Sequence, residues 1–118
     1  MVKVLDANKF STRLIDRSTW ASLVPQKVIE ITEHCPGLKE RERAILIYTQ
    51  DSDGRMVQML KTYPGSETLG AETNFHFDSL RYFSPAPSRD TAFGWWANRV
   101  GLPNDVLRNF ILNHAPAG

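Results

Sequence analysis

The chain has 118 residues, with 14 Lys and Arg against 13 Asp and Glu, so its net charge is only +1. Hydrophobic residues make up 42% and charged residues 23% of the sequence, which excludes a disordered, collagen-like or membrane composition. The length predicts one domain over residues 1–118, and the charge lacks the basic excess that favours nucleic-acid binding.

The first eighteen residues fit two local structures. The apolar residues at positions 2, 4 and 5 favour an edge strand or an arm, and those at positions 10, 14 and 15 favour a short helix. The sequence of residues 1–18 therefore does not decide between these local structures.

The next segment has helical spacing. Its apolar residues recur at steps of four, four and three, at Trp20, Val24, Val28 and Ile31. Pro25 is compatible only with the first turn of a helix. We therefore expect an N-terminal helix from about residue 23 or 25 to residue 34, which Pro36 and Gly37 end.

The middle of the chain predicts about three antiparallel strands. Residues 44–48 are apolar and rich in strand formers, residues 51–54 form a turn, and residues 55–63 return as the second strand of a hairpin. Residues 72–78 alternate between Thr73, Phe75 and Phe77 on one face and polar residues on the other, as in a half-buried strand.

Two helices follow. One has an apolar stripe between Ala92 and Val100 and ends at Gly101, and the next begins at Pro103 and shares an apolar face between Val106 and Ile111. The fold class is therefore α+β: a small antiparallel sheet of about three strands, with the N-terminal helix and the two C-terminal helices packed on one face. We expect the C-terminal helices to join through Trp96, Val100, Leu107 and Phe110.

The last two helices also carry a DNA-binding pattern. Ala97, Gly101, Leu107 and Phe110 are spaced by four, six and three residues, a pattern that resembles the helix-turn-helix motif. The resemblance covers about twenty residues within 89–113. It implies that the outward residues of the second helix read base edges, as Arg and Asn side chains can, at Asn104, Arg108 and Asn109. A DNA-binding regulator is therefore an alternative function.

The polar face of the third strand suggests a second alternative. Glu72, Asn74, His76 and Asp78 follow one another on the same side of the strand. Carboxylates beside an imidazole can perform acid–base chemistry, so Glu72, His76 and Asp78 are candidate catalytic residues of a small-molecule pocket protein or a simple enzyme. The alternative interpretation is a sheet face in contact with solvent.

A third group of candidate site residues is aromatic. Trp95 lies about 100° around the helix from the buried stripe, and Arg99, four residues on, can stack over its indole. Tyr82 is close in sequence. Trp and Arg dominate the energetics of protein interfaces, so Trp95, Arg99 and Tyr82 are candidate partner- or ligand-binding residues. The alternative is that Trp95 only covers the edge of the core.

The leading hypothesis is a non-enzymatic binding or regulatory module that acts through protein–protein contact, as a homodimer or with a small protein partner. No catalytic signature, cofactor motif or metal-ligand spacing is present in the sequence, and the single Cys35 excludes a cysteine-rich zinc site. The sequence has no leader or membrane-length apolar run, so we expect a soluble, cytoplasmic protein without a membrane partner.

Overall fold

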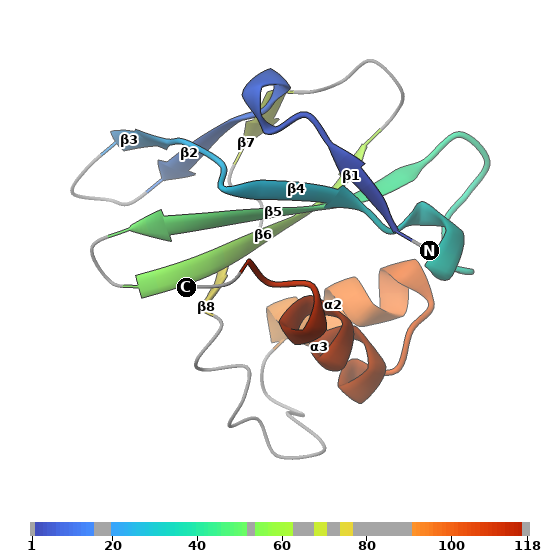
Figure 1. Ribbon diagram of the computed structural model, residues 1–118. Helices are drawn as coiled ribbons and strands as arrows, with labels where there is room; N and C mark the ends of the chain where they lie inside the picture. The colour runs from blue at the N-terminus through green and yellow to red at the C-terminus, as the bar shows by residue number, and fades with distance from the viewer. Residues whose placement is uncertain are drawn as a thin grey trace.

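The computed structural model describes residues 2–15, 20–51, 54–62, 68–70, 74–76 and 91–116 (Figure 1). Its elements, in chain order, are β1 (Lys3–Leu5), η1 (Ala7–Lys9), β2 (Ser11–Ile15), β3 (Trp20–Leu23), β4 (Lys27–Glu30), η2 (Thr32–His34), β5 (Arg43–Asp51), β6 (Gly54–Thr62), β7 (Thr68–Gly70), β8 (Asn74–His76), α2 (Thr91–Val100) and α3 (Asn104–Asn113), where η marks a 3₁₀ helix.

The strands form two sheets. An antiparallel sheet has the order β1-β4-β5-β6-β8, and a smaller sheet has the order β3-β2-β7, with β2 antiparallel to β3 and parallel to β7. Figure 1 shows α2 and α3 on one side of the larger sheet and the smaller sheet on the other. The mixed α+β class is therefore confirmed, whereas the expected count of about three strands is too low.

The predicted N-terminal helix is wrong. Residues 27–30 form strand β4, which pairs with β1 on one edge and β5 on the other, and only Thr32–His34 form one short helical turn. The strand is buried on both faces, because Val28 packs with Phe10 while Ile29 packs toward the helices. Burial on both faces requires consecutive rather than alternating apolar residues, and this spacing is similar to the apolar stripe of a helix.

The two predictions for the N-terminal residues have different outcomes. The edge strand is confirmed, since β1 pairs with β4 at the margin of the larger sheet. The short helix over positions 10–15 is wrong, because residues 11–15 form β2, which pairs with β3 and β7 on its two edges. These two pairings, one with the next strand in the chain and one with the distant β7, override the local helical spacing.

The predicted hairpin is confirmed. Strands β5 and β6 pair antiparallel from Arg43 opposite Thr62 to Asp51 opposite Gly54. The third predicted strand is present as β8, which pairs with β6, while positions 72, 73, 77 and 78 lie outside the described residues.

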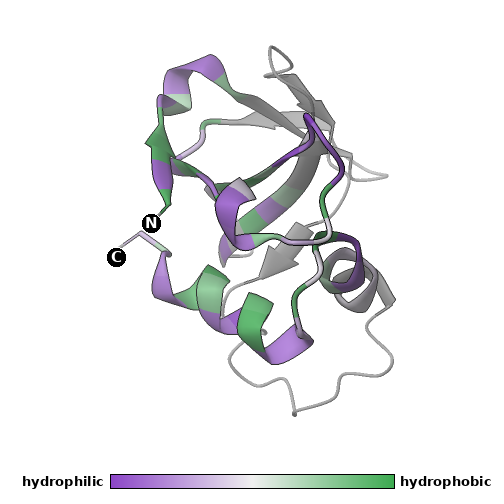
Figure 2. Ribbon diagram, turned by 90° about the vertical axis from the view of Figure 1, so that its right-hand side faces the viewer, coloured by the Kyte–Doolittle hydropathy of each residue, from purple (hydrophilic) through white to green (hydrophobic). Residues whose placement is uncertain are grey.

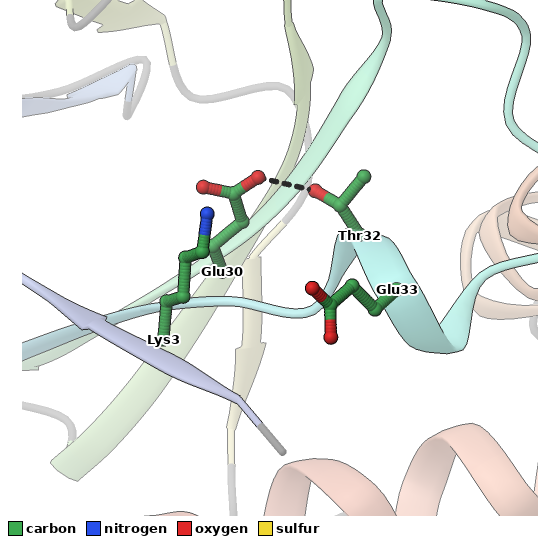
Figure 3. A pocket seen from close by; sticks show the side chains of 4 residues that line it. All are labelled: Lys3, Glu30, Thr32 and Glu33. Carbon is green, nitrogen blue, oxygen red and sulfur yellow. Dashed lines mark hydrogen bonds between the residues drawn. The ribbon is translucent and has the colours of Figure 1, made fainter.

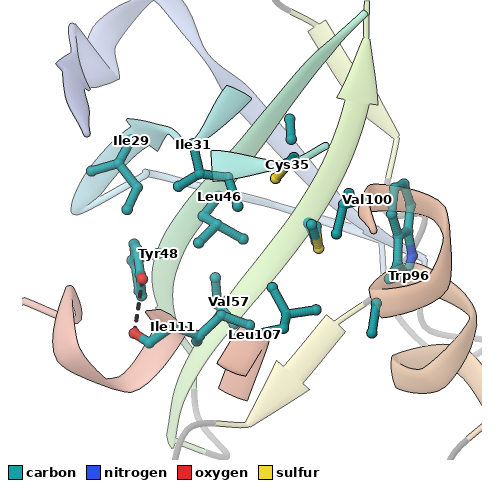
Figure 4. Packing of buried hydrophobic residues seen from close by; sticks show 13 residues of the cluster. Ile29, Ile31, Cys35, Leu46, Tyr48, Val57, Trp96, Val100, Leu107 and Ile111 are labelled. Carbon is teal, nitrogen blue, oxygen red and sulfur yellow. Dashed lines mark hydrogen bonds between the residues drawn. The ribbon is translucent and has the colours of Figure 1, made fainter. Parts of the chain in front are cut away.

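The core between the helices and the larger sheet confirms the predicted seam. Trp96 and Val100 of α2 and Leu107 of α3 are buried in one cluster (Figure 4). Phe110 is partly buried and packs against the same cluster. The Tyr48 hydroxyl also donates a 2.8 Å hydrogen bond across this interface to the Ile111 carbonyl oxygen. Figure 2 shows the matching change between apolar and polar residues along α3, as expected for an amphipathic helix.

Two glycines bring the loop after η2 onto the turn between α2 and α3. The Gly37 amide donates a 2.9 Å hydrogen bond to the Val100 carbonyl oxygen, and Gly101 has a φ of 77°. A Cβ atom on Gly37 would lie 2.7 Å from the Gly101 nitrogen. Because backbone meets backbone here, only glycine permits this approach.

A pair of alanine substitutions tests this contact. Gly37→Ala places a methyl group 2.7–2.8 Å from backbone atoms, so we expect a loss of about 1–3 kcal/mol in the free energy of unfolding. The control is Gly94→Ala in α2, where the nearest atom of the described residues to the new Cβ is 3.8 Å away and a gain of up to about 1 kcal/mol is expected. Urea unfolding measures both, and equal stability of Gly37→Ala and the wild type would contradict the close contact.

Candidate functional site

The most prominent exposed side chain among the described residues of the two helices is Trp95. It keeps 53% of its surface exposed, although its neighbour Trp96 is 2% exposed. The two indoles meet edge to face, with ring centroids 5.0 Å apart and an interplanar angle of 88°. The buried ring of Trp96 therefore fixes the position of the exposed ring of Trp95.

The predicted stacking of Arg99 on Trp95 is confirmed. The Arg99 Cζ atom lies 5.5 Å from the centroid of the Trp95 ring, within the range of a cation–π contact. The Arg99 Nε atom is buried without a hydrogen-bond partner. The guanidinium thus lies over the indole of Trp95, and Arg99 is the one charged residue in the sequence of α2.

Gly94 lies beside this pair. Among the described residues, a Cβ atom here would meet the Asn104 Nδ2 at 3.8 Å, which is ordinary van der Waals distance. Glycine inside a helix costs about 1 kcal/mol relative to alanine, and no close contact with the described residues requires it. We call Gly94, Trp95, Asn98 and Arg99 the Trp95 surface; Asn98 is exposed and Gly94 and Arg99 are half-buried.

The other candidate partner-binding residue, Tyr82, lies outside the described residues. The same holds for Glu72 and Asp78 of the proposed acid–base row. His76 is placed in β8 opposite Met56, but its side chain is not described. The acid–base hypothesis therefore stays a prediction.

The residues of the DNA-binding alternative lie along α3. Asn109 is exposed, and Asn104 and Arg108 are half-buried. The exposed Asp105 lies in the first turn of the same helix, where its charge opposes contact with phosphates. The DNA-binding role of α3 stays a prediction.

One pocket in the described part of the chain was not expected from the sequence. It has a volume of about 210 Å³ and is lined by Lys3 of β1, Glu30 of β4, and Thr32 and Glu33 of η2 (Figure 3). The Thr32 hydroxyl donates a 2.6 Å hydrogen bond to Glu30, and Arg43 forms a 2.9 Å ion pair with the same carboxylate. These residues meet only because β1, β4 and β5 are neighbouring strands.

The charges in this pocket are compensated within the fold. Burial raises the pKa of Glu30, but the hydrogen bonds from Arg43 and Thr32 and the charges of Arg43 and Lys3 outweigh burial and lower it below its ordinary value. Glu30 is therefore ionised at neutral pH and paired. Such a carboxylate holds strands together and is a poor general acid or base.

Two histidines, His34 and His114, share one aromatic contact. The rings of His34 and His114 lie 5.1 and 4.5 Å from the ring of Phe110. His114 is the C-cap residue of α3, and its Nδ1 lies 2.9 Å from the Phe110 carbonyl oxygen. His34 instead ends the short turn η2. The cluster joins η2 to α3.

Cys35 is buried, and burial raises the pKa of its thiol to about 12. The thiol therefore stays protonated at neutral pH and is unreactive. The described residues contain no group of three or more side chains that could hold a metal ion. In the same residues, no helix is both long enough and apolar enough to span a membrane.

Comparisons with known proteins give no relative: no protein family, no curated protein and no solved structure matches the chain. The residues described above are therefore the whole basis for a function.

Glu30→Gln tests the role of the pocket. At pH 7 we expect a loss of about 1–3 kcal/mol in the free energy of unfolding, because Arg43 loses a charged partner. The lowered pKa means that the wild type has this contribution above the pKa of the unfolded chain and loses it as the pH falls through the folded value. The difference in the free energy of unfolding between the wild type and Glu30→Gln should therefore become smaller at acid pH.

The matched control is Glu33→Gln, which removes an exposed carboxylate from the same pocket and should change stability by less than about 0.5 kcal/mol. Urea titrations at neutral and acid pH measure both variants. A loss for Glu30→Gln that is equally large at both pH values would contradict the ion-pair role.

Proposed function

We propose that the chain is a small non-enzymatic binding or regulatory module that acts through protein–protein contact at the Trp95 surface. The observation that carries this proposal is the half-exposed indole of Trp95, held between the buried Trp96 and the guanidinium of Arg99. A side chain that is already fixed loses little conformational freedom when a partner covers it.

The composition of the surface supports a protein partner. Trp and Arg are the residues most enriched among those that dominate binding energy, and here they are in direct contact. Exposed apolar side chains scattered singly are ordinary, but a tryptophan with 53% of its surface in solvent leaves a large apolar area uncovered.

The charge of the chain supports a second copy as this partner. A net charge of +1 causes little repulsion between two copies at neutral pH, and proteins with a charge near zero associate readily. A homodimer also agrees with the prevalence of twofold symmetry among small soluble assemblies.

Trp95→Ala tests the proposal by sedimentation equilibrium. We expect the wild type to form dimers and the variant to dissociate at least about ten times more readily, because the substitution removes the proposed anchor of the contact. Val24→Ala is the control, since Val24 is 82% exposed on another part of the surface and its truncation should leave the association constant unchanged.

Circular dichroism checks that Trp95→Ala keeps the fold, which we expect because Trp96 supplies the buried contact. A wild-type chain that stays monomeric at every concentration would contradict self-association. A dimer that Trp95→Ala leaves intact would show that the contact lies elsewhere.

A further inference from the structure

We propose that the pocket between β1, β4 and η2 binds a small zwitterion of the α-amino acid class. In this site the Lys3 ammonium binds the carboxylate of the ligand, and the Glu33 carboxylate binds its ammonium. The inference goes beyond the proposed function, because it assigns a small-molecule site to elements other than α2.

The register of β1 and β4 brings two of the lining residues together. Lys3 and Glu30 are direct partners in this antiparallel pair, so their side chains project from the same face of the sheet. Figure 3 shows the Lys3 ammonium beside the Glu30 carboxylate, whose charge it stabilises. The chain then turns through η2, and the Glu33 carboxylate points back toward these side chains. Residues 3, 30 and 33 thus line one pocket.

The Glu30 carboxylate is part of the wall of the pocket. Arg43 donates a 2.9 Å hydrogen bond to one of its oxygens, and the Thr32 hydroxyl donates a 2.6 Å hydrogen bond to the other. The Thr32 hydroxyl oxygen also accepts a 3.2 Å hydrogen bond from the Ala44 amide. Glu30 is therefore a positioning residue, since its fixed charge attracts the Lys3 ammonium.

Four charged side chains lie in or beside the pocket, and their charges sum to zero. Arg43 and Glu30 form an ion pair with each other. Lys3 and Glu33 are exposed, and neither forms an ion pair or a hydrogen bond with another described side chain. The pocket therefore offers a ligand one ammonium and one carboxylate.

These two groups determine which charge the ligand must carry. The Glu33 carboxylate would repel an anion bound at Lys3, and the Lys3 ammonium would repel a cation bound at Glu33. A neutral ligand would displace water from both charges without replacing it by an ionic partner. A zwitterion instead gains a charge-assisted hydrogen bond at each end. The pocket is therefore complementary to a ligand that carries one charge of each sign.

The volume of the pocket favours a small ligand. It is about 210 Å³, which is less than the roughly 300–1,000 Å³ of pockets that hold drug-sized molecules. An α-amino acid carries its ammonium and its carboxylate on one carbon atom, so it offers both charges in a molecule of few atoms. A peptide separates its two charged ends by at least one further residue and needs more space. A free amino acid therefore fits this pocket better than a peptide does.

Titration of the isotope-labelled chain with L-alanine tests the site by NMR. We expect saturable shifts of the backbone amides of Lys3, Thr32 and Glu33. N-acetyl-L-alanine lacks the ammonium of this probe, and L-alaninamide lacks its carboxylate. Each should bind at least about ten times more weakly, because one charged hydrogen bond is lost. L-alanyl-L-alanine tests the spacing of the charges and should also bind more weakly than L-alanine.

Two substitutions test the roles of the lining residues. Lys3→Gln and Glu33→Gln should each raise the dissociation constant of L-alanine at least about ten times. Both side chains are exposed, so the fold should persist, which circular dichroism checks. The matched controls are Lys9→Gln and Glu40→Gln, which remove the same charges from exposed positions outside the pocket and should leave the dissociation constant unchanged.

The outcomes distinguish this site from the Trp95 surface. A lack of saturable shifts up to the solubility limit of L-alanine would overturn the pocket as a binding site. Equal affinity for L-alanine and for either singly charged analogue would overturn the selection of a zwitterion, and tighter binding of the dipeptide would overturn the proposed spacing. Trp95→Ala should leave L-alanine binding unchanged, so either proposal can fail without the other.

Discussion

The rotation of about 100° between neighbouring residues of an α-helix is the constraint on which the exposed surface depends. Trp96 is 2% exposed and packs with Val100 and Leu107 against the larger sheet. Once Trp96 is fixed inward, Trp95 must point to the side and outward, where 53% of its surface meets solvent. Folding therefore exposes this indole as a direct consequence of burying its neighbour.

Contacts from distant parts of the chain make this orientation rigid. The backbone contact of Gly37 with Gly101 holds the turn that follows α2, and the bond from Tyr48 to the Ile111 carbonyl holds α3 against β5. Arg99 then covers one side of the indole. A surface supported in this way presents one geometry to a partner, which reduces the entropic cost of binding.

Three polar features of the described residues outside α2 have structural explanations. Arg43 and Thr32 pair with Glu30 in the pocket, and burial keeps the Cys35 thiol protonated. The His34 and His114 rings flank Phe110 and join η2 to the end of α3. These groups make contacts within the described part of the fold. The Nε2 atom of His34 and the side-chain polar atoms of Thr49 and Gln58 are buried without a hydrogen-bond partner.

Local patterns predicted the parts of the fold whose neighbours in space are also neighbours in sequence. The hairpin of β5 and β6 follows from two apolar runs and a turn, and α2 and α3 follow from their stripes and from Gly101. The stacking of Arg99 on Trp95 is a contact between residues four positions apart, so it was predicted as well.

Long-range pairing explains what the sequence did not predict. Strand β4 is buried on both faces, so its apolar residues have a spacing similar to that of a helix. The pairing of β4 with β1 and β5 and its packing toward the helices involve distant residues, which a short stretch of sequence does not reveal. The pocket at Glu30 and the contact of Gly37 with Gly101 also join distant residues.

Hydroxyl-radical labelling of the wild-type chain, read by mass spectrometry at residue level, measures most directly whether Trp95 is covered by a partner. Labelling of Trp95 is expected to fall as the protein concentration rises, while the 70% exposed Val4 and the 82% exposed Val24 keep their labelling. Equal labelling of Trp95 at all concentrations, or protection confined to Val4 or Val24, would contradict a contact at the Trp95 surface.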